Sequence, residues 1–509
     1  MRTMGLRATL IALCASAAVS PSLASADTAL TPHDLQLLNR VTWGATPADV
    51  AEMQKLGPRR WLDRQLHPSR ADRLPDAIQS QVDNLTITRQ PMAQILDQAE
   101  VLRIAEADAQ NADQKATSGK AYKQFLADRH TDAIQRSLLR DIYSPDQLQE
   151  QMTWFWFNHF NVFSHKRDIR AMLGDYEETA LRPHALGRFR DLLEATLKHP
   201  AMLRYLDNDQ NAVGKINENY AREIMELHTM GVGSGYSQKD VQELARILTG
   251  VGVDLKPDDP RLKPEWQALY IRQGDFVFNP RRHDFGDKVF LGHQIKGSGF
   301  GEVEQALDIL IREPATAHHI CLQLATFFVG DSPPPALVER MAQSFRQSDG
   351  DIAKVLKTLF DSREFSDSLG TQFKDPMHYV ISAARLSYGD RTIVNTGPIA
   401  NWLTRLAEGL YDHSTPDGYP LTSAAWTGPG QLTNRFEIAR QIGSGAPLLF
   451  LTGNDQPKGP VERPQIQAEL QTVSLDKGLG APTLSALNQT QSPQDWNALF
   501  LSSPEFMRR

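Results

Sequence analysis

Cysteine is scarce in this sequence, and basic side chains are not in excess. Its 509 residues include two cysteines, Cys14 and Cys321, and 54 basic side chains stand against 61 acidic ones, for a formal net charge of −7. Two thiols are too few to build a disulfide framework. We therefore expect the chain to rely on its hydrophobic core for stability. The acidic balance lacks the basic surface that nucleic acid requires, and we therefore expect no nucleic-acid partner.

Several catalytic signatures are also absent. The sequence has no G-x-S-x-G, Walker loop, H-E-x-x-H or C-x-x-C motif, which removes several large enzyme classes. The glycine-rich stretch Gly231–Gly235 follows a predicted helix and has the wrong spacing for a dinucleotide fingerprint. With 41% hydrophobic and 23% charged residues, the composition is typical of a soluble globular protein rather than a disordered or polytopic membrane protein.

The first 26 residues have the three-part layout of a secretory signal. Two arginines precede an apolar run over residues 8–19, and Ala24-Ser25-Ala26 provides a small-residue cleavage site. We expect cleavage after Ala26 and a periplasmic or secreted product. The apolar run is shorter than the roughly 20 residues that cross a bilayer, so we expect no transmembrane anchor. The alternative is an uncleaved helix at the membrane interface.

Helix start signals recur along the remaining chain, and strand signals are few. Ser, Thr or Asp precedes proline at Thr31, Thr46, Ser144, Asp375 and Ser492, and capping-box spacings begin at Ser144 and Ser237. These signals predict a mainly α fold, a helical bundle-like architecture with small β-hairpin insertions. A long helical hairpin is expected over about residues 95–141, with its break at Ser118-Gly119. A β-hairpin is expected from residues 275–279 and 288–292.

The length predicts more than one packed unit, because a single core stops growing near 250–300 residues. We divide the chain into a signal peptide (1–26), an N-terminal helical subdomain with the long hairpin (27–143), a central helical core with the candidate site (144–250), a β-hairpin insertion (251–300) and a C-terminal helical subdomain (301–509).

Two polar residues lie inside a strongly apolar helix. Asn158 and His159 interrupt the run Trp154–Phe163, which is apolar on every side and should therefore be buried. A buried polar group without a partner costs about 1–3 kcal/mol, so both side chains need partners. They are either core residues that brace neighbouring loops or parts of a functional site.

The densest polar cluster follows in residues 217–228. On a regular helix Asn219, Arg222, Glu223 and Glu226 share one side, while His228 lies on the apolar side. Glu223 and Glu226 are close enough to raise the pKa of one carboxyl, as acid–base catalysis uses. The alternative is a solvated face on which Arg222 forms ordinary ion pairs with glutamates one turn away.

Other residues complete the candidate site. Asp207 and Asn208 follow a short predicted helix that begins at Pro200, close in sequence to the glutamate helix. His283 could bind an anionic group from a polar hairpin, with a polar turn as the alternative. Asp417–Pro420, Trp426 and Arg435 could line a carbohydrate or peptide pocket, with a packed loop as the alternative. We expect the groups around residues 158, 207 and 223 to converge on one pocket.

The ordered blocks of this chain resemble one bacterial family, catalogued as domain of unknown function 1800. The resemblance rests on the segments Leu38–Pro47, Trp156–Phe160, Arg182–Phe189, His199–Asn208, Asn217–His228, His283–Lys288 and Ser503–Phe506. It departs from the family pattern at Val251, where tryptophan is usual. The resemblance implies an exported, mostly helical protein whose relatives are often encoded beside a sulfatase-like family. It implies no reaction and no catalytic residues.

Three functions fit these features. The first is an exported hydrolase or lyase acting on an envelope or extracellular polymer, with Glu223 and Glu226 as acid and base and with His159, Asn158, Asn208 and Arg222 positioning substrate. The second is a metal-dependent enzyme in which Glu223, Glu226, Asp207 and a histidine bind a divalent cation; no other cofactor is indicated. The third is a non-catalytic partner or maturation factor of a co-exported, sulfatase-like protein.

Overall fold

A computed structural model describes residues 30–69, 73–256, 258–452, 461–472 and 478–509. It is 62% helical and has only small antiparallel sheets, which confirms the mainly α prediction. The proposed signal peptide lies outside the described residues. Within them, no helix is both long and apolar enough to cross a membrane.

The N-terminal third consists of eight α-helices. They are α1 (Pro32–Val41), α2 (Pro47–Leu56), α3 (Pro58–Leu66), α4 (Asp76–Asn84), α5 (Thr86–Arg89), α6 (Met92–Ala107), α7 (Ala112–Tyr143) and α8 (Gln147–His159). Thr31 and Thr46 cap α1 and α2, as predicted, and each also forms a complete capping box, with Asp34 and Asp49 respectively. Ser144 does not start a helix: it ends α7, and Asp146 is the cap of α8.

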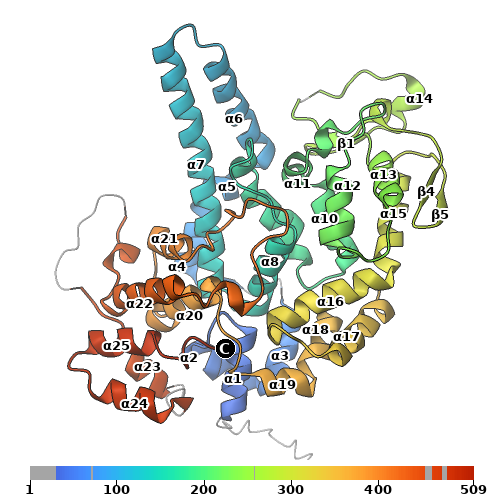
Figure 1. Ribbon diagram of the computed structural model, residues 1–509. Helices are drawn as coiled ribbons and strands as arrows, with labels where there is room; N and C mark the ends of the chain where they lie inside the picture. Colours follow the sequence, from blue (N-terminus) through green and yellow to red (C-terminus); the bar gives the residue numbers. More distant parts are fainter. Residues whose placement is uncertain (1–29, 70–72, 257, 453–460, 473–477) are drawn as a thin grey trace, which may run out of the picture.

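The long helical hairpin is confirmed, but its break was misplaced. Helices α6 and α7 project side by side from the rest of the molecule and turn at residues 108–111 (Figure 1). Gly119 lies inside α7, where an added Cβ would stand 2.6 Å from the Glu106 carboxylate of α6. The glycine therefore permits close packing of the two helices instead of ending one of them.

The centre of the chain contains shorter helices and two small sheets. The helices are α9 (Leu173–Asp175), α10 (Phe189–Lys198), α11 (Pro200–Tyr205), α12 (Asn219–Glu223), α13 (Gln238–Ile247) and α14 (Pro264–Gln267), with π-helical segments η2 (Tyr176–Leu181) and η5 (Ile224–His228). The strands are β1 (Val251–Val253), β2 (Ile271–Gln273), β3 (Phe276–Phe278), β4 (Lys288–Phe290) and β5 (His293–Ile295).

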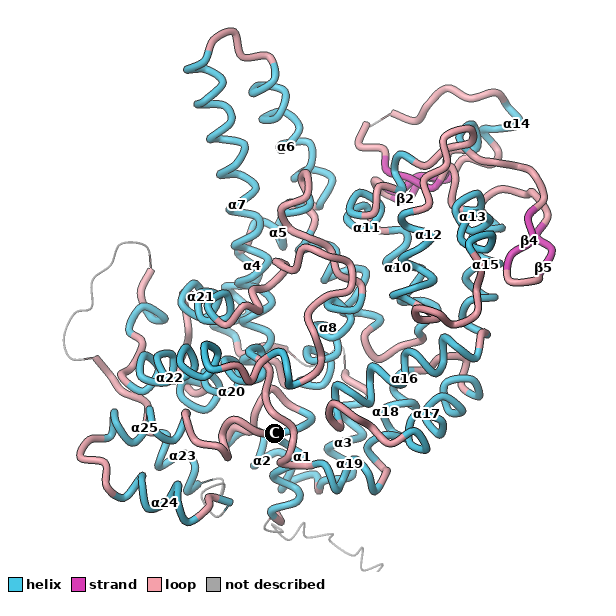
Figure 2. The backbone as a smooth tube through the Cα atoms, in the orientation of Figure 1, coloured by secondary structure: helices cyan, strands magenta, loops and turns pink. Residues whose placement is uncertain are grey.

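The predicted β-hairpin between residues 275–279 and 288–292 is wrong in its pairing. Strand β3 pairs with β1 and β2, whereas β4 pairs with β5 (Figure 2). The tight turns lie elsewhere: Gly274 has φ 59°, and Leu291 and Gly292 have φ 47° and 79°. Two-residue hairpin loops require such positive φ values, and the sequence between β3 and β4 instead forms the short 3₁₀ turn η6 (Pro280–Arg282).

The C-terminal part returns to helices. They are α15 (Gly301–Arg312), α16 (Pro314–Phe328), α17 (Pro335–Gln347), α18 (Ile352–Phe360), α19 (Arg363–Ser368), α20 (Pro376–Tyr388), α21 (Gly397–Arg405), α22 (Pro429–Gly443), α23 (Ile466–Thr472), α24 (Ala481–Asn488) and α25 (Pro493–Leu501). Asp375 and Ser492 cap α20 and α25, as predicted. The last residues lie beside α1, so segments distant in sequence meet there (Figure 1).

One large hydrophobic cluster runs through most of the described chain, from Leu35 in α1 to Met507. Helix α8 lies at its centre with almost every residue buried, as its all-round apolar sequence predicts. Helix α20 is buried over its whole length. These two central helices therefore carry the polar side chains that most need an explanation.

Candidate active site

A cavity of about 310 Å³ lies at the C-terminal end of α8. Its wall is formed by α8 together with Leu227 of η5, Gln323 of α16 and the loop of residues 413–421, which we call the Asp417 loop. The lining residues are Phe155, Asn158, His159, Leu227, Gln323, Asp417, Gly418, Tyr419, Pro420 and Leu421. Two residues predicted from the apolar helix thus line a common cavity with Asp417.

Asn158 holds the Asp417 loop against α8. Its Nδ2 donates to the Tyr419 carbonyl over 2.9 Å, and its Oδ1 accepts from the Tyr419 backbone nitrogen over 2.6 Å. Asn161 holds the same loop by donating to the carbonyls of His413 and Thr415. Gly418 has φ 70°, and an added Cβ would stand 2.2 Å from the Asn158 carbonyl oxygen, so this close approach requires glycine. Asn158 therefore positions the loop.

His159 joins α8 to the ends of two other helices. Its Nε2 lies 3.1 Å from the His228 carbonyl at the end of η5, and its Nδ1 lies 2.6 Å from the Gln323 side chain of α16. His319, one turn before Gln323, donates to the Leu227 carbonyl. Because the last carbonyls of a helix have no partner within it, the two histidines satisfy groups that η5 leaves free.

Burial, helped by neighbouring His319, lowers the pKa of His159 to about 4, so the ring is neutral at pH 7. A neutral ring that donates from Nε2 must accept at Nδ1, which requires Gln323 to present its NH₂ group there. The amide oxygen of Gln323 then faces Nε2 of His319, which lies 3.1 Å from the amide group. His159 is consequently a neutral positioning group and a poor general base.

The glutamate helix does not continue with regular geometry. Helix α12 changes at Ile224 into the π-helical η5, so the expected 3.6-residue spacing fails beyond Glu223. Arg222 bonds Glu218 over 3.3 Å and Glu226 over 3.2 Å, in the arrangement that the solvated-face alternative described. Glu226 is thus held by an arginine.

Glu223 differs from its two neighbours. Its carboxylate is half-buried and has no hydrogen-bond or ion-pair partner among the described residues. Burial raises its pKa; the nearby carboxylates of Glu226 and Asp417 add to the rise, and Arg222 opposes it. Glu223 and Asp417 also both raise the pKa of Tyr205, after burial, so the three side chains share one neighbourhood. The carboxylate of Glu226 is thus the stronger negative influence on Glu223, as the sequence predicts, and Asp417 adds a weaker one from the cavity wall.

The Asp207–Asn208 turn lies at the start of the glutamate helix, as predicted. Asn219 donates to the Leu206 carbonyl over 3.1 Å. Asp207, however, forms ion pairs with Lys166 and Arg167, at 2.8 Å and 3.0 Å. Asn208 is buried and donates to the Val251 carbonyl. These residues connect backbone segments and do not line the cavity at His159.

The remaining predicted site residues are dispersed. His283 is buried in an ion pair with Glu302, whose other oxygen binds Lys288. Trp426 is buried and donates to the Pro420 carbonyl, so it supports the Asp417 loop without lining the cavity. Arg435 is fully buried near α20, where it donates to the Lys374 carbonyl. The structure does not bring His283 or Arg435 to the cavity.

No group of three or more histidine, cysteine, aspartate or glutamate side chains in the described part of the chain is arranged to hold a metal ion. The two glutamates and Asp207, which the metal hypothesis joins, belong to separate networks. His228 is a core residue, as its apolar side predicts: it is fully buried, and burial lowers its pKa well below the usual value.

Sequence reasoning missed Gln323, His319 and Asn161. Each is a polar side chain in or beside a strongly apolar helix, the signal that identified Asn158 and His159. The first two lie in α16, whose polar positions were not considered.

Searches for similar curated proteins and for similar solved structures gave no match. The family model described as "Protein of unknown function (DUF1800)" matches residues 36–508, and the chain therefore belongs to this family.

Proposed function

We propose that this protein is an exported hydrolase or lyase that acts on an envelope or extracellular polymer by acid–base catalysis. The observation that supports it best is the half-buried Glu223, whose pKa is raised by burial and by the charges of Glu226 and Asp417, together with the position of Asp417 in the wall of the cavity at the end of α8. Export rests on the signal-like N-terminus. Two carboxyls in different environments are the usual equipment for moving a proton to a leaving group and from a nucleophile.

Glu223 is the acid in this proposal. Its raised pKa keeps a proton on the carboxyl to higher pH than in an exposed glutamate, because burial and the charge of Glu226 outweigh the opposing charge of Arg222. Asp417 is the base. Its Oδ1 accepts from the Thr415 hydroxyl over 2.5 Å, which orients the carboxylate at the cavity wall.

The other predicted catalytic residues change their roles. Glu226 is held by Arg222 and tunes the proton affinity of Glu223 by its charge. His159 and Asn158 fix the two walls, one by binding the end of η5 and the other by binding the Asp417 loop. Tyr419 and Phe155 supply apolar lining against which a sugar ring or another repeating unit could pack.

The test compares the mature wild-type protein with Glu223→Gln and Asp417→Asn on a panel of envelope polysaccharides and polyesters. Removing a general acid or base lowers the rate about 10²–10⁴-fold, and we expect that loss for each variant. Glu218→Gln is the matched control, because Glu218 directly precedes α12 and its carboxylate pairs, among the described residues, with Arg222 and Gln238. Unchanged activity of Glu223→Gln would contradict the proposal.

If no polymer is cleaved, co-purification from the native host tests the non-catalytic alternative. A stable complex with a co-exported protein that survives Glu223→Gln would favour a partner or maturation role over catalysis.

A further inference from the structure

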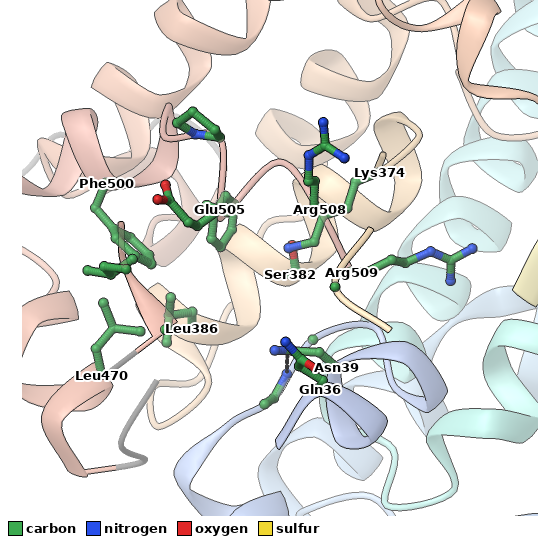
Figure 3. A pocket seen from close by; sticks show the side chains of 17 residues that line it. Gln36, Asn39, Lys374, Ser382, Leu386, Leu470, Phe500, Glu505, Arg508 and Arg509 are labelled. Carbon is green, nitrogen blue, oxygen red and sulfur yellow. Dashed lines mark hydrogen bonds between the residues drawn. The ribbon is translucent and has the colours of Figure 1, made fainter. Parts of the chain in front are cut away.

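A second cavity, of about 340 Å³, lies between the end of α1, helix α20 and the C-terminal segment of residues 504–509 (Figure 3). Lys374 and Ser382 line it from the α20 side, and Gln36 and Asn39 line it from α1. None of its lining residues belongs to the cavity at the end of α8. The inference drawn from it is therefore independent of the proposed function.

Lys374 and Ser382 are in direct contact in this cavity. The Lys374 Nζ lies 2.9 Å from the Ser382 Oγ, and the two residues are only 5% and 3% exposed. Lys374 directly precedes Asp375, the cap of α20, and Ser382 lies two turns into that helix. Figure 3 shows the amine and the hydroxyl close together among the lining residues, and the hydroxyl also donates to the Tyr379 carbonyl over 3.1 Å.

Gly44 packs directly against Ser382. Its backbone has φ 125°, and an added Cβ would stand 2.6 Å from the Ser382 Cβ. Any side chain at this position would therefore collide with the serine or displace it. Thus α1 and α20 approach each other closely without closing the cavity over the hydroxyl.

The surroundings of Lys374 weaken its hold on a proton. Burial, followed by the charges of Arg509 and Arg435, lowers the pKa of Lys374 to about 7. No carboxylate bonds its Nζ among the described residues, and the ammonium instead lies 3.9 Å from the centre of the Phe506 ring. Near neutral pH about half of the molecules therefore carry an uncharged amine beside the hydroxyl.

We propose that Ser382 and Lys374 form a serine–lysine nucleophile pair that accepts an acyl group from an ester. A nucleophilic serine needs an adjacent base, and lysine serves as that base in known variants of the serine triad. The cavity supplies both groups at hydrogen-bond distance. Nothing at the Glu223 site is required for this reaction.

The step balances without a further reactant. Ser382 Oγ attacks the carbonyl carbon, forming a new C–O bond while its proton moves to Lys374 Nζ. The C–O bond to the alcohol then breaks, and the departing alkoxide takes that proton from Lys374. Water, deprotonated by the same amine, later cleaves the acyl-serine and releases a carboxylic acid and free Ser382.

The lining indicates the class of ester. Leu386, Leu470 and Phe500 give the cavity an apolar end suited to a hydrocarbon acyl chain. Asn39 stands at the polar end, where its Oδ1 accepts from the Ala45 nitrogen and leaves its NH₂ as a donor for the carbonyl oxygen of the ester. An uncharged ester with a medium-length acyl chain fits both ends.

The test treats the mature protein with a fluorophosphonate, which forms a stable bond with activated serines, and maps the modified peptide by mass spectrometry. We expect the adduct on Ser382, with a labelling rate that rises with pH around a midpoint near 7. Ser382→Ala should reduce labelling at least 100-fold, and Lys374→Met at least 10-fold. Hydrolysis of a p-nitrophenyl octanoate probe should fall in parallel.

Ser387→Ala is the matched control, because Ser387 is equally buried on the same helix but does not line the cavity. Labelling of that variant should equal the wild-type level. An adduct on another residue, no adduct on the folded wild-type protein, or a labelling rate independent of Lys374 would overturn the proposal. Because the peptide map is made on the wild type, the test does not depend on the variants folding.

Discussion

At the end of α8 the buried polar side chains are neutral, whereas at the start of α20 they are charged. Asn158, His159 and Gln323 bind backbone groups and one another. The second region, which we call the α20 charge cluster, contains the buried Lys374, His378, Glu408, Arg435 and Arg509 and the partly buried Asp375. Neutral amides can satisfy a loop at little electrostatic cost, whereas buried ions must compensate one another.

Asp375 is the carboxylate that mainly balances the positive charges of the α20 charge cluster. Asp375 bonds His378 over 2.8 Å, and His378 contacts Arg509 in turn. These partners outweigh burial and lower the pKa of Asp375 to about 2. Burial, reinforced by the charge of Asp375, raises the pKa of Glu408 well above its usual value. Asp375 is therefore the carboxyl of this cluster that ionises more readily, and Glu408 is the one that holds its proton more tightly.

The largest effect is expected from Asp375→Asn. Removing one member of a buried ion network costs about 3–5 kcal/mol, because the remaining charges are left uncompensated. Ionisation of Glu408 in the variant should keep the loss near the lower value. Urea unfolding at pH 7 measures it, with Asp361→Asn as the control, since that exposed aspartate pairs only with Lys357. Equal losses in the two variants would show that the cluster is not balanced by Asp375.

Acid should lower the free energy of unfolding through His159, in the neutral region at the end of α8. Its folded pKa of about 4 lies below the ordinary value near 6.5, so the unfolded chain binds this proton first as pH falls. The stability contributed by the neutral ring is complete above pH 6.5 and decreases between pH 6.5 and 4. The loss reaches about 3 kcal/mol at pH 4.

Unfolding free energies of wild type and His159→Asn at several pH values isolate this contribution. The variant should have a shallower decrease below pH 6.5, whatever constant offset its lost hydrogen bonds introduce. An exposed histidine replaced in the same way, His293→Asn, provides the control. Parallel pH curves for wild type and His159→Asn would contradict a neutral His159.

Asn158→Leu should have a smaller effect, confined to the Asp417 loop. The change leaves the Tyr419 nitrogen and carbonyl without their side-chain partner, which costs about 1–3 kcal/mol. Hydrogen exchange should accelerate over residues 413–421 and remain unchanged in α20. Asn158→Asp keeps the acceptor for the Tyr419 nitrogen and should lose less; an unchanged exchange rate in the loop would contradict the positioning role.

The contrast also explains what the sequence could predict. Helix starts, the buried α8 and the partners required by Asn158 and His159 followed from local patterns, because capping and periodicity depend on neighbours along the chain. The nearness of the Asp207 turn to the glutamate helix followed from the few residues that separate them.

The rest depended on contacts that no local pattern encodes. Asp417, whose charge adds to the raised pKa of Glu223, lies almost 200 positions further along the chain, and the change from α12 to the π-helical η5 has no counterpart in the local sequence pattern. Gly119 resembled a helix break because its packing against Glu106 could not be read from α7 alone. The sequence assigned Arg435 and His283 to a pocket by residue type. In the structure Arg435 binds the Lys374 carbonyl and His283 binds Glu302, both away from the cavity.

The smallest effect on stability is expected at His228, a buried histidine without hydrogen-bond partners for its ring among the described residues, in contrast to His159. His228 lies 6.0 Å from His159, measured between ring centres, yet neither of its ring nitrogens has a hydrogen-bond partner in the described part of the chain. Its ring packs against Phe160 at 4.9 Å. A buried donor without a partner is a cost that an apolar ring of similar shape avoids.

We therefore expect His228→Phe to raise the free energy of unfolding by about 1 kcal/mol, whereas His159→Phe should lower it. Phenylalanine is slightly larger, and the strain of fitting it limits the gain. The His228 carbonyl that binds His159 is a backbone group and survives the substitution, so the walls of the first cavity stay in place. Urea unfolding at pH 7 compares the two variants. A loss of several kcal/mol in His228→Phe would show that the ring has a polar partner, and that the region at the end of α8 depends on it.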